Sequence, residues 1–260
     1  MLAAVRGGHL SIIEIILQSM ETSVRELGAF REEMLWEAVR HDQEAVVQML
    51  LVHGTDVNAL PYANGRDHGC AIKIAASQGY HHLVRTLLDH GADLDCESQA
   101  PIIAAAQGGH EEVVQLLLEY GASMEEAFIS AVDGGQVHLL KYLLKRGVDV
   151  QAKGQSSQTI GMKALERAII TKNPAMISIL IDLGVPINHD NPTPYDNPMV
   201  IAKTFSAEWI VNYLLSLGAE DREVDLDETP DTFLEDCYNL QMLRGGIRLT
   251  ERTWEWVGKY

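Results

Sequence analysis

The stretch Ala105-Ala106-Gln107-Gly108-Gly109-His110 decides the fold, together with the apolar pairs that follow it. Val113-Val114 stand eight and nine residues after Ala105, and Leu117-Leu118 stand twelve and thirteen residues after it. Apolar pairs four residues apart form one face of a helix. Gly121, sixteen residues after Ala105, ends that helix because the residue after a helix often needs a positive φ. The pattern predicts a short helix, a tight turn and a second helix.

The same spacing recurs six more times along the chain. If the first alanine of each copy is position 0, then positions +8, +9, +12 and +13 are apolar in every copy. Position +16 is a glycine in every copy except the first, where Met20 stands. Seven copies predict about seven stacked helix pairs, each packed on its neighbours. The anchor alanines at position 0 are Ala4, Ala38, Ala75, Ala105, Ala131, Ala168 and Ala202.

In this spacing the chain resembles the ankyrin-repeat proteins over residues 1–219, in a divergent form. The resemblance implies an all-α solenoid of about seven helix-pair repeats, and we expect residues 220–260 to form an acidic link and a helical C-terminal cap. The family's Thr-Pro-Leu-His tetrapeptide is eroded and survives only as Ala100-Pro101-Ile102-Ile103 and Asn197-Pro198-Met199-Val200. In the family its Thr and His form hydrogen bonds within and between repeats. We therefore expect weak polar ladders between the repeats of this chain.

The distance between successive anchors varies, and the links between repeats must absorb the difference. The shortest distance is 26 residues, from Ala105 to Ala131. Within it Ser123 is followed three residues later by Glu126, which is the signature of a capping box at a helix start. We expect the next helix to begin there and the array to lack a β-hairpin finger at that point.

Charge and composition exclude some classes of function. The chain carries 37 acidic and 20 basic residues, a net charge of −17, which disfavours nucleic acid and favours a neutral or basic protein partner. No apolar run reaches the roughly 18 residues of a membrane span. Cys70, Cys96 and Cys237 are widely spaced and odd in number, so we expect reduced thiols. Together these features predict a cytoplasmic or nuclear protein, and they leave its oligomeric state open.

One cluster of residues has the types that catalysis uses. It contains Tyr62, Arg66, Asp67, His68, Cys70 and Lys73. An acid, a base and a thiol close together could support proton transfer or nucleophilic attack. No Ser-His-Asp spacing, phosphate-binding loop or doubled metal-ligand pair accompanies the cluster. We therefore assign no catalytic residue, metal or cofactor. We expect Trp36 and Trp209 to lie in the core.

The resemblance implies a binding surface on the concave face of the solenoid. The family binds through positions +2 and +3 of the first helix and through the fingers that precede it. The lining is polar in the first half of the array and becomes more apolar in the second half. The residues that we predict to bind a partner are Arg40, His41, Arg66, Asp67, Ser77, Gln78, Gln107, Ile160, Met162, Ile170 and Phe205.

The expected function is non-catalytic recognition of another protein by this surface. A few anchors should supply most of the affinity, with Phe205, Ile160, Arg66 and Trp36 the first to consider. The alternative is a small-molecule-binding protein or an enzyme of proton-transfer or cyclisation type, in a fungal biosynthetic pathway, with a groove near His68. A third possibility is a scaffold segment of a larger chain.

Overall fold

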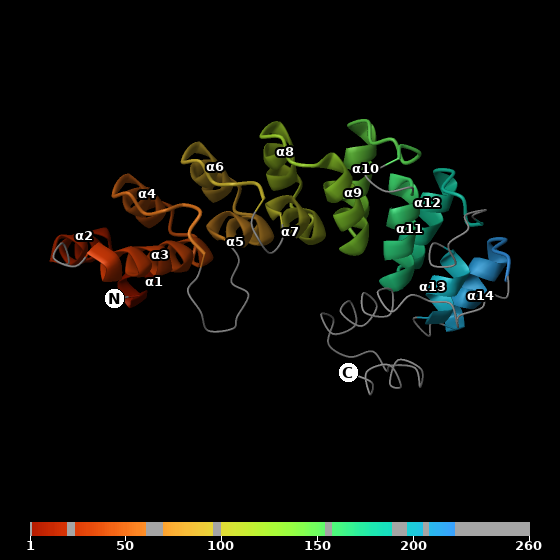
Figure 1. Ribbon diagram of the computed structural model, residues 1–260, viewed down its shortest axis with the longest axis horizontal. Helices are drawn as coiled ribbons and strands as arrows, with labels where there is room; N and C mark the ends of the chain where they lie inside the picture. Colours follow the sequence, from red (N-terminus) through yellow and green to blue (C-terminus); the bar gives the residue numbers. More distant parts are fainter. Residues whose placement is uncertain are drawn as a thin grey trace. The chain divides into compact units, whose positions relative to one another are not determined.

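The computed structural model describes residues 2–19, 24–60, 70–95, 100–153, 158–188, 197–204 and 208–221. Within these ranges the chain forms helices α1 to α14 and an isolated β-bridge between Lys153 and Thr159, which confirms the all-α class (Figure 1). Two compact units divide the chain, Met1–Val148 and Asp149–Tyr260. This division falls inside the single array expected over residues 1–219. The expected cap, beyond residue 221, lies outside the described residues.

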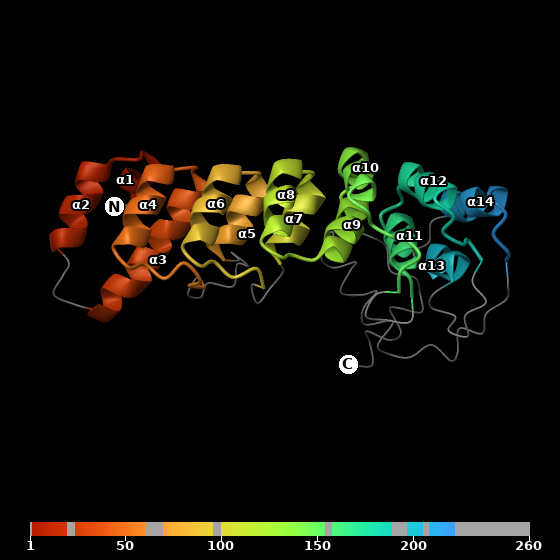
Figure 2. The same cartoon turned by 90° about the horizontal axis from the view of Figure 1, so that it is seen from above.

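The described part of unit 1 forms five helix pairs. We call the first member of each pair the inner helix and the second the outer helix. The inner helices α1, α3, α5, α7 and α9 contact one another in succession, and each contacts its own outer helix (Figure 2). The outer helices α4, α6 and α8 form a second row. The bounds are α1 Leu2–Arg6, α2 Leu10–Ser19, α3 Val24–Arg40, α4 Glu44–Val52, α5 Ala71–Gln78, α6 His81–Asp89, α7 Pro101–Gly108, α8 Glu111–Glu119, α9 Met124–Asp133 and α10 Val137–Lys145.

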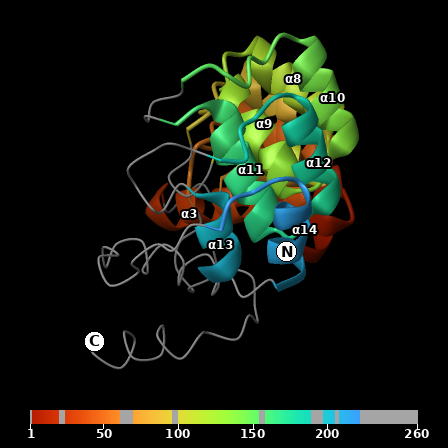
Figure 3. The same ribbon diagram turned by 90° about the vertical axis from the view of Figure 1, so that its right-hand side faces the viewer.

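Unit 2 contains two further pairs, whose helices are shown in Figure 3. Helix α11 packs on α12 and on α13, and α13 packs on α14. Gly161 lies near the start of α11, where a Cβ atom would stand 2.6 Å from Val185 Cγ2 and 2.9 Å from the Val150 carbonyl oxygen. A larger side chain would therefore force these segments apart. The bounds are α11 Ile160–Ile170, α12 Pro174–Asp182, α13 Pro198–Thr204 and α14 Glu208–Ser216.

The anchor alanines form the inner core of both units. All of them are fully buried except Ala4, which is half-buried. Position +8 is likewise buried in every pair except the first, where Ile12 is exposed. The repeated spacing thus marks core positions, as expected. Trp209 occupies position +7, which is exposed in every pair, and its own exposure is 48%. The expectation that Trp209 lies in the core is therefore wrong.

The helix ends follow the expected rule. At position +16 Gly91 has a φ of 84°, and the following Ala92 donates its N–H to the Leu87 carbonyl at 3.0 Å. This pattern, in which the left-handed residue lets the chain turn back on the last carbonyls, is the Schellman motif. The expected short link is also confirmed. Helix α9 begins directly after Ser123, whose hydroxyl accepts the Glu126 N–H at 3.2 Å.

Polar contacts between successive pairs are stronger than expected in unit 1. Gln43 donates its Nε2 hydrogen to the Arg6 carbonyl at 3.1 Å, and Gln136 does the same to the Gln107 carbonyl at 2.9 Å. The Nε2 atom of His110 lies 3.0 Å from the Ser77 carbonyl, and this nitrogen must carry the proton because a carbonyl only accepts. In each case a side chain at position +5 reaches a backbone carbonyl at position +2 of the preceding pair. The expectation of weak polar ladders is wrong for these junctions, because residues outside the eroded tetrapeptide form them.

A second ladder joins the links that follow the outer helices. The Asn58 side chain donates to the Gly91 carbonyl at 3.1 Å and accepts the Asp93 N–H at 2.8 Å. In unit 2 Asn188 makes the same two contacts, to the Gly218 carbonyl at 3.0 Å and from the Glu220 N–H at 2.8 Å. Both asparagines stand at position +20 of their pair. One amide therefore satisfies two backbone groups of the following link.

Cys70 departs from the sequence expectation. It is buried, as expected for a small side chain at the start of α5, but it is disulfide-bonded. Its partner lies outside the described residues. The expectation of three reduced thiols is therefore wrong. In the part of the chain that the structure describes, no helix has the length and apolar character needed to cross a membrane.

Candidate functional site

The predicted binding residues of unit 1 that the structure describes lie in one row at the C-terminal ends of the inner helices. Each inner helix contributes its position +2, and two pairs also contribute position +3, which is His41 directly after α3 and Gln78 on α5. The row is continuous because successive inner helices contact one another. We call it the inner-end row, and it consists of Arg6, Arg40, His41, Ser77, Gln78, Gln107 and Asp133.

The middle of the inner-end row also holds the array together. The Ser77 hydroxyl donates to the Ile74 carbonyl at 2.9 Å, and Gln107 donates to the Asp133 carboxylate at 2.9 Å. Both side chains are half-buried, whereas Gln78 is exposed. Because the carbonyls of Ser77 and Gln107 accept the ladder bonds described above, these two residues fix the geometry of the row. Gln78 is the member of this part that a partner can reach most readily.

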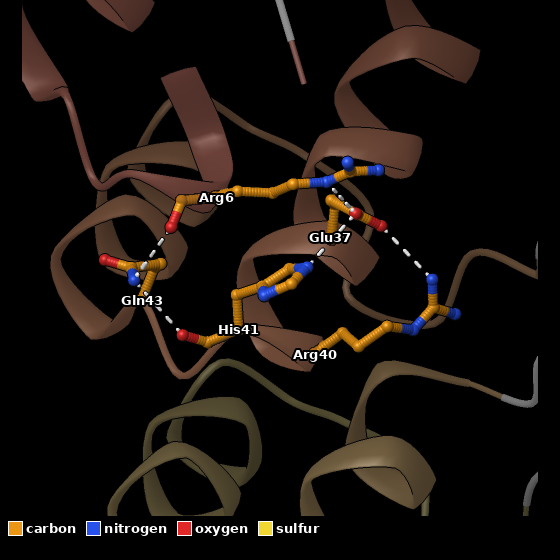
Figure 4. A network of polar contacts seen from close by, with 5 residues as sticks. All are labelled: Arg6, Glu37, Arg40, His41 and Gln43. Atoms are coloured by element: carbon orange, nitrogen blue, oxygen red, sulfur yellow. Dashed lines mark hydrogen bonds and ion pairs between the residues drawn. The ribbon is translucent and has the colours of Figure 1, made fainter. Parts of the chain in front are cut away.

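A cluster of charged residues occupies the N-terminal end of the row (Figure 4). Glu37, on α3, is only 8% exposed and lies between Arg6, from α1, and Arg40. One carboxylate oxygen of Glu37 accepts from Arg6 Nε at 2.5 Å and lies 3.3 Å from His41 Nε2. The other oxygen accepts from Arg40 at 3.1 Å. Two successive helix pairs are thus joined through a single buried carboxylate.

The electrostatics of the cluster favour an ionised Glu37. Burial by itself raises the pKa of this carboxyl. The hydrogen bond from Arg6 and the positive charges of Arg6, Arg40 and His41 act in the opposite direction and outweigh burial, so the pKa lies below its ordinary value of 4.5. Glu37 is therefore negative at neutral pH. Its charge is enclosed, while the arginines around it remain accessible.

The predicted site residues of unit 2 differ in accessibility. Ile160 and Met162 are half-buried at the start of α11, where Thr159 caps the helix by accepting the Met162 N–H at 3.2 Å. Ile170 is 5% exposed and packs inside the unit. We therefore do not retain Ile170 in the proposed surface. In unit 1 Trp36 is 8% exposed, so it belongs to the core as expected and is not available as an anchor.

Several residues singled out from the sequence lie outside the described residues. They include three of the predicted binding residues, Arg66, Asp67 and Phe205, and also His68 of the candidate catalytic cluster. His82, which follows the candidate catalytic cluster in the sequence, is exposed, and its Nε2 lies 3.0 Å from the Asp42 carboxylate. Within the described ranges no group of histidine, cysteine and acidic residues could hold a metal ion.

Sequence reasoning missed the central residue of the cluster. Glu37 stands between Trp36 and Ala38 in the otherwise apolar run Met34-Leu35-Trp36-Glu37-Ala38-Val39. A charged residue inside a buried helical segment is rare unless it has a partner. That rule, together with the arginine at position +2 in each of the first two copies, could have indicated the cluster.

The fold and the inner-end row together define a helical-repeat protein built from short stacked pairs. Residues 35–127 match the family model described as ankyrin repeats in three copies. A crystal structure of the human ASB11 ankyrin repeat domain superposes with a TM-score of 0.60 at 21% identity, covering 86% of this chain and 98% of that one. Residues 35–127 are therefore ankyrin repeats, and over most of its length the chain has the fold of an ankyrin repeat domain.

Curated relatives also carry ankyrin repeats. The Caenorhabditis elegans ankyrin repeat and KH domain-containing protein mask-1 is 24% identical over 90% of this chain and 9% of its own length. A Caenorhabditis briggsae ankyrin repeat and KH domain-containing protein, CBG24701, is 31% identical over 63% of this chain and 6% of its own length. The chain therefore spans less than a tenth of these two relatives. Ankyrin repeat domain-containing protein SAT10 of Stachybotrys chartarum is 26% identical over 85% of this chain and 11% of its own length.

Proposed function

We propose that the chain recognises another protein, without catalysis, through the inner-end row of unit 1. Ankyrin repeats generally mediate contacts between proteins, which supports recognition as the general role. The observation that carries the proposal is that Arg6, Arg40, His41 and Gln78 are accessible and are presented from inner helices that stack in succession. A partner that docks on such a surface loses little free energy to ordering it.

Other parts of the predicted surface extend this proposal. Ile160 and Met162 would give a partly apolar contact on unit 2. Arg66, Asp67 and Phe205 lie outside the described residues and stay predictions, as does the placement of the surface on a concave face. The alternative of a small-molecule site or enzyme near His68 also stays a prediction. A cytoplasmic or nuclear location stays a prediction.

The proposal can be tested by selecting ligands from a phage-displayed peptide library against the immobilised chain. A row variant carries His41→Glu and Gln78→Glu. A control variant carries Arg85→Glu and Lys141→Glu, which alter exposed positions on the outer helices α6 and α10. We expect most selected peptides to bind the row variant more weakly than the wild type and to bind the control variant as tightly as the wild type. Peptides that still bind the row variant but no longer bind the control would overturn the proposal, because they would place recognition on the outer helices.

A further inference from the structure

We propose that Arg6 and Arg40 form a clamp for a carboxylate-bearing segment of the partner, and that Glu37 positions both guanidinium groups for it. This inference rests on the proposed function, because it assigns a chemical class of partner to one end of the inner-end row. It differs from the expectation drawn from net charge. A chain of net charge −17 favours a neutral or basic partner as a whole, whereas this clamp selects an acidic segment.

The clamp rests first on the arrangement of charge in depth. Glu37 has a side chain that is only 10% exposed, while those of Arg6 and Arg40 are 55% and 43% exposed. The negative charge therefore lies beneath the two positive charges. Figure 4 shows the guanidinium groups on either side of Glu37, with their terminal nitrogens extending beyond it. A ligand that approaches this end of the row meets the arginines before it meets the carboxylate.

The hydrogen-bond capacity of the arginines is the second argument. A guanidinium group has five N–H donors. Glu37 accepts from Nε of Arg6 and from one terminal nitrogen of Arg40, and both of its oxygens are occupied by these bonds and by His41. Each arginine therefore keeps terminal N–H groups beyond those that Glu37 uses. One carboxylate cannot neutralise two arginines, so a surplus positive charge remains at this position.

The preferred anion follows from geometry and from the charge of the whole chain. Terminal guanidinium nitrogens form paired hydrogen bonds with a planar carboxylate. A nucleic acid would bring many phosphates near a strongly acidic chain, and the repulsion would exceed the gain from two arginines. A short acidic peptide brings only a few charges, and screening over about 10 Å at 0.1 M salt limits their repulsion by distant acidic residues. The clamp therefore fits glutamate or aspartate side chains of a protein partner.

The experiment measures binding of a fluorescent decapeptide with glutamates at its centre, using the full chain and fluorescence polarisation. A second decapeptide has glutamine in place of each glutamate. We expect only the glutamate peptide to bind, with Arg6→Gln and Arg40→Gln each weakening it by about tenfold or more, as lost charge-assisted hydrogen bonds require. Arg40→Lys should weaken binding of the glutamate peptide less than Arg40→Gln does, since lysine keeps the positive charge but lacks the paired N–H donors of the guanidinium group. Arg85→Gln is the control and should leave the affinity unchanged.

Several outcomes would refute the clamp. They are equal binding of the two peptides, no binding of either, and an affinity unchanged by Arg40→Gln in a chain whose circular dichroism matches that of the wild type. Tighter binding of inorganic phosphate or of a single-stranded oligonucleotide, lost on Arg40→Gln, would also refute it by assigning the arginines to a phosphate. Selected phage ligands that need His41 and Gln78 but lack acidic residues would refute the clamp and leave protein recognition standing. Selected phage ligands whose binding depends on no residue of the inner-end row would refute both the clamp and recognition through this row.

Discussion

The junction between the α3–α4 and α5–α6 pairs and the junction between the α5–α6 and α7–α8 pairs use the same positions in different ways. At the second of these junctions Gly79 stands at position +4 and has a φ of 76°. A Cβ atom on Gly79 would lie 2.5 Å from His110 Nδ1, so the glycine leaves the space in which the His110 ring reaches the Ser77 carbonyl. The junction is closed by a side chain bound to the backbone.

The first of these junctions has Asp42 where the second has Gly79, and Tyr80 where the second has His110. Asp42 has a φ of 57° although it is not a glycine, and its carboxylate lies 3.0 Å from His82 Nε2. The Tyr80 ring lies beside that of His82, with ring centroids 6.4 Å apart. Among the described residues Tyr80 forms no ladder bond to the preceding pair. At this junction a side chain at position +4 thus makes an exposed contact between Asp42 and His82 in place of a backbone-directed bond, and an exposed contact contributes less.

The largest effect is expected from Gly79→Ala. The substitution forces an alanine into the left-handed region and places its methyl group against the His110 ring, so unfolding should become easier by about 2–4 kcal/mol. Gly91→Ala is the matched control, since Gly91 also has a positive φ but nothing lies within 4 Å of its Cβ position. Its cost should be about 1–2 kcal/mol. Urea denaturation of both variants measures the difference, and equal losses would show that the space around His110 is unimportant.

A smaller loss is expected from His110→Ala. The variant leaves the Ser77 carbonyl without its partner at a half-buried position, which should cost about 1–2 kcal/mol in urea denaturation. His138→Ala is the control, because its side chain is 91% exposed and its contact with Glu111 is a surface pair. A loss no greater than that of His138→Ala would contradict the structural role of the ladder.

The ladder should also be transferable to the junction that lacks it. Asp42→Gly relieves the left-handed backbone but removes the pair with His82, and we expect a gain of about 0.5 kcal/mol. Adding Tyr80→Gln should gain about 0.5–1.5 kcal/mol more, as the new amide reaches the Arg40 carbonyl. Thermal and urea denaturation compare the single and double variants. Lys172→Gly is the control. Lys172 also has a positive φ, 56°, so its replacement by glycine relieves the same kind of backbone strain without introducing a ladder side chain. No additional gain in the double variant would show that the Asp42 position does not decide which bond forms.

The junction between the first two pairs contains the buried carboxylate of Glu37 in addition to its ladder bond. The contribution of this carboxylate should appear in the pH dependence of stability. The pKa of Glu37 is lowered in the folded chain, so its contribution to stability is complete above the ordinary value of 4.5 and is lost as the pH falls through the folded value. The wild type should therefore exceed Glu37→Gln in stability at pH 7, and the gap should narrow below pH 4.5. Glu112→Gln, at an exposed position on α8, controls for the loss of one acidic residue. A gap that stays constant from neutral to acidic pH would contradict this account.

Much of the fold could be predicted because its signals are local and repeated. The anchor alanines, the apolar pairs and the closing glycines each act within a few residues, so one spacing identifies all of them. The expectation for Trp209 is wrong because position +7 directly precedes the core pair but does not face the core, even though large apolar side chains are usually buried. Its exposure shows that position within the repeat outweighs residue type.

The candidate site was predictable in outline only. The row at positions +2 and +3 followed from the resemblance, but the sequence could not tell that Ile170 is buried and Arg40 exposed, although they occupy the same position in their pairs. The link between Arg6 and Glu37 joins residues 31 apart in the chain. Such a contact depends on how two pairs stack, and no local pattern specifies it.

The sequence by itself determined the all-α class, the helix ends and the positions of the core, because helix formation and termination depend on neighbours within a few residues. Only the tertiary structure decided which side chains join one pair to the next. Those bonds reach backbone carbonyls roughly 30 residues away, as between His110 and Ser77. Whether such a bond can form depends on the space that a glycine leaves in the neighbouring pair, and that space exists only once the pairs have stacked.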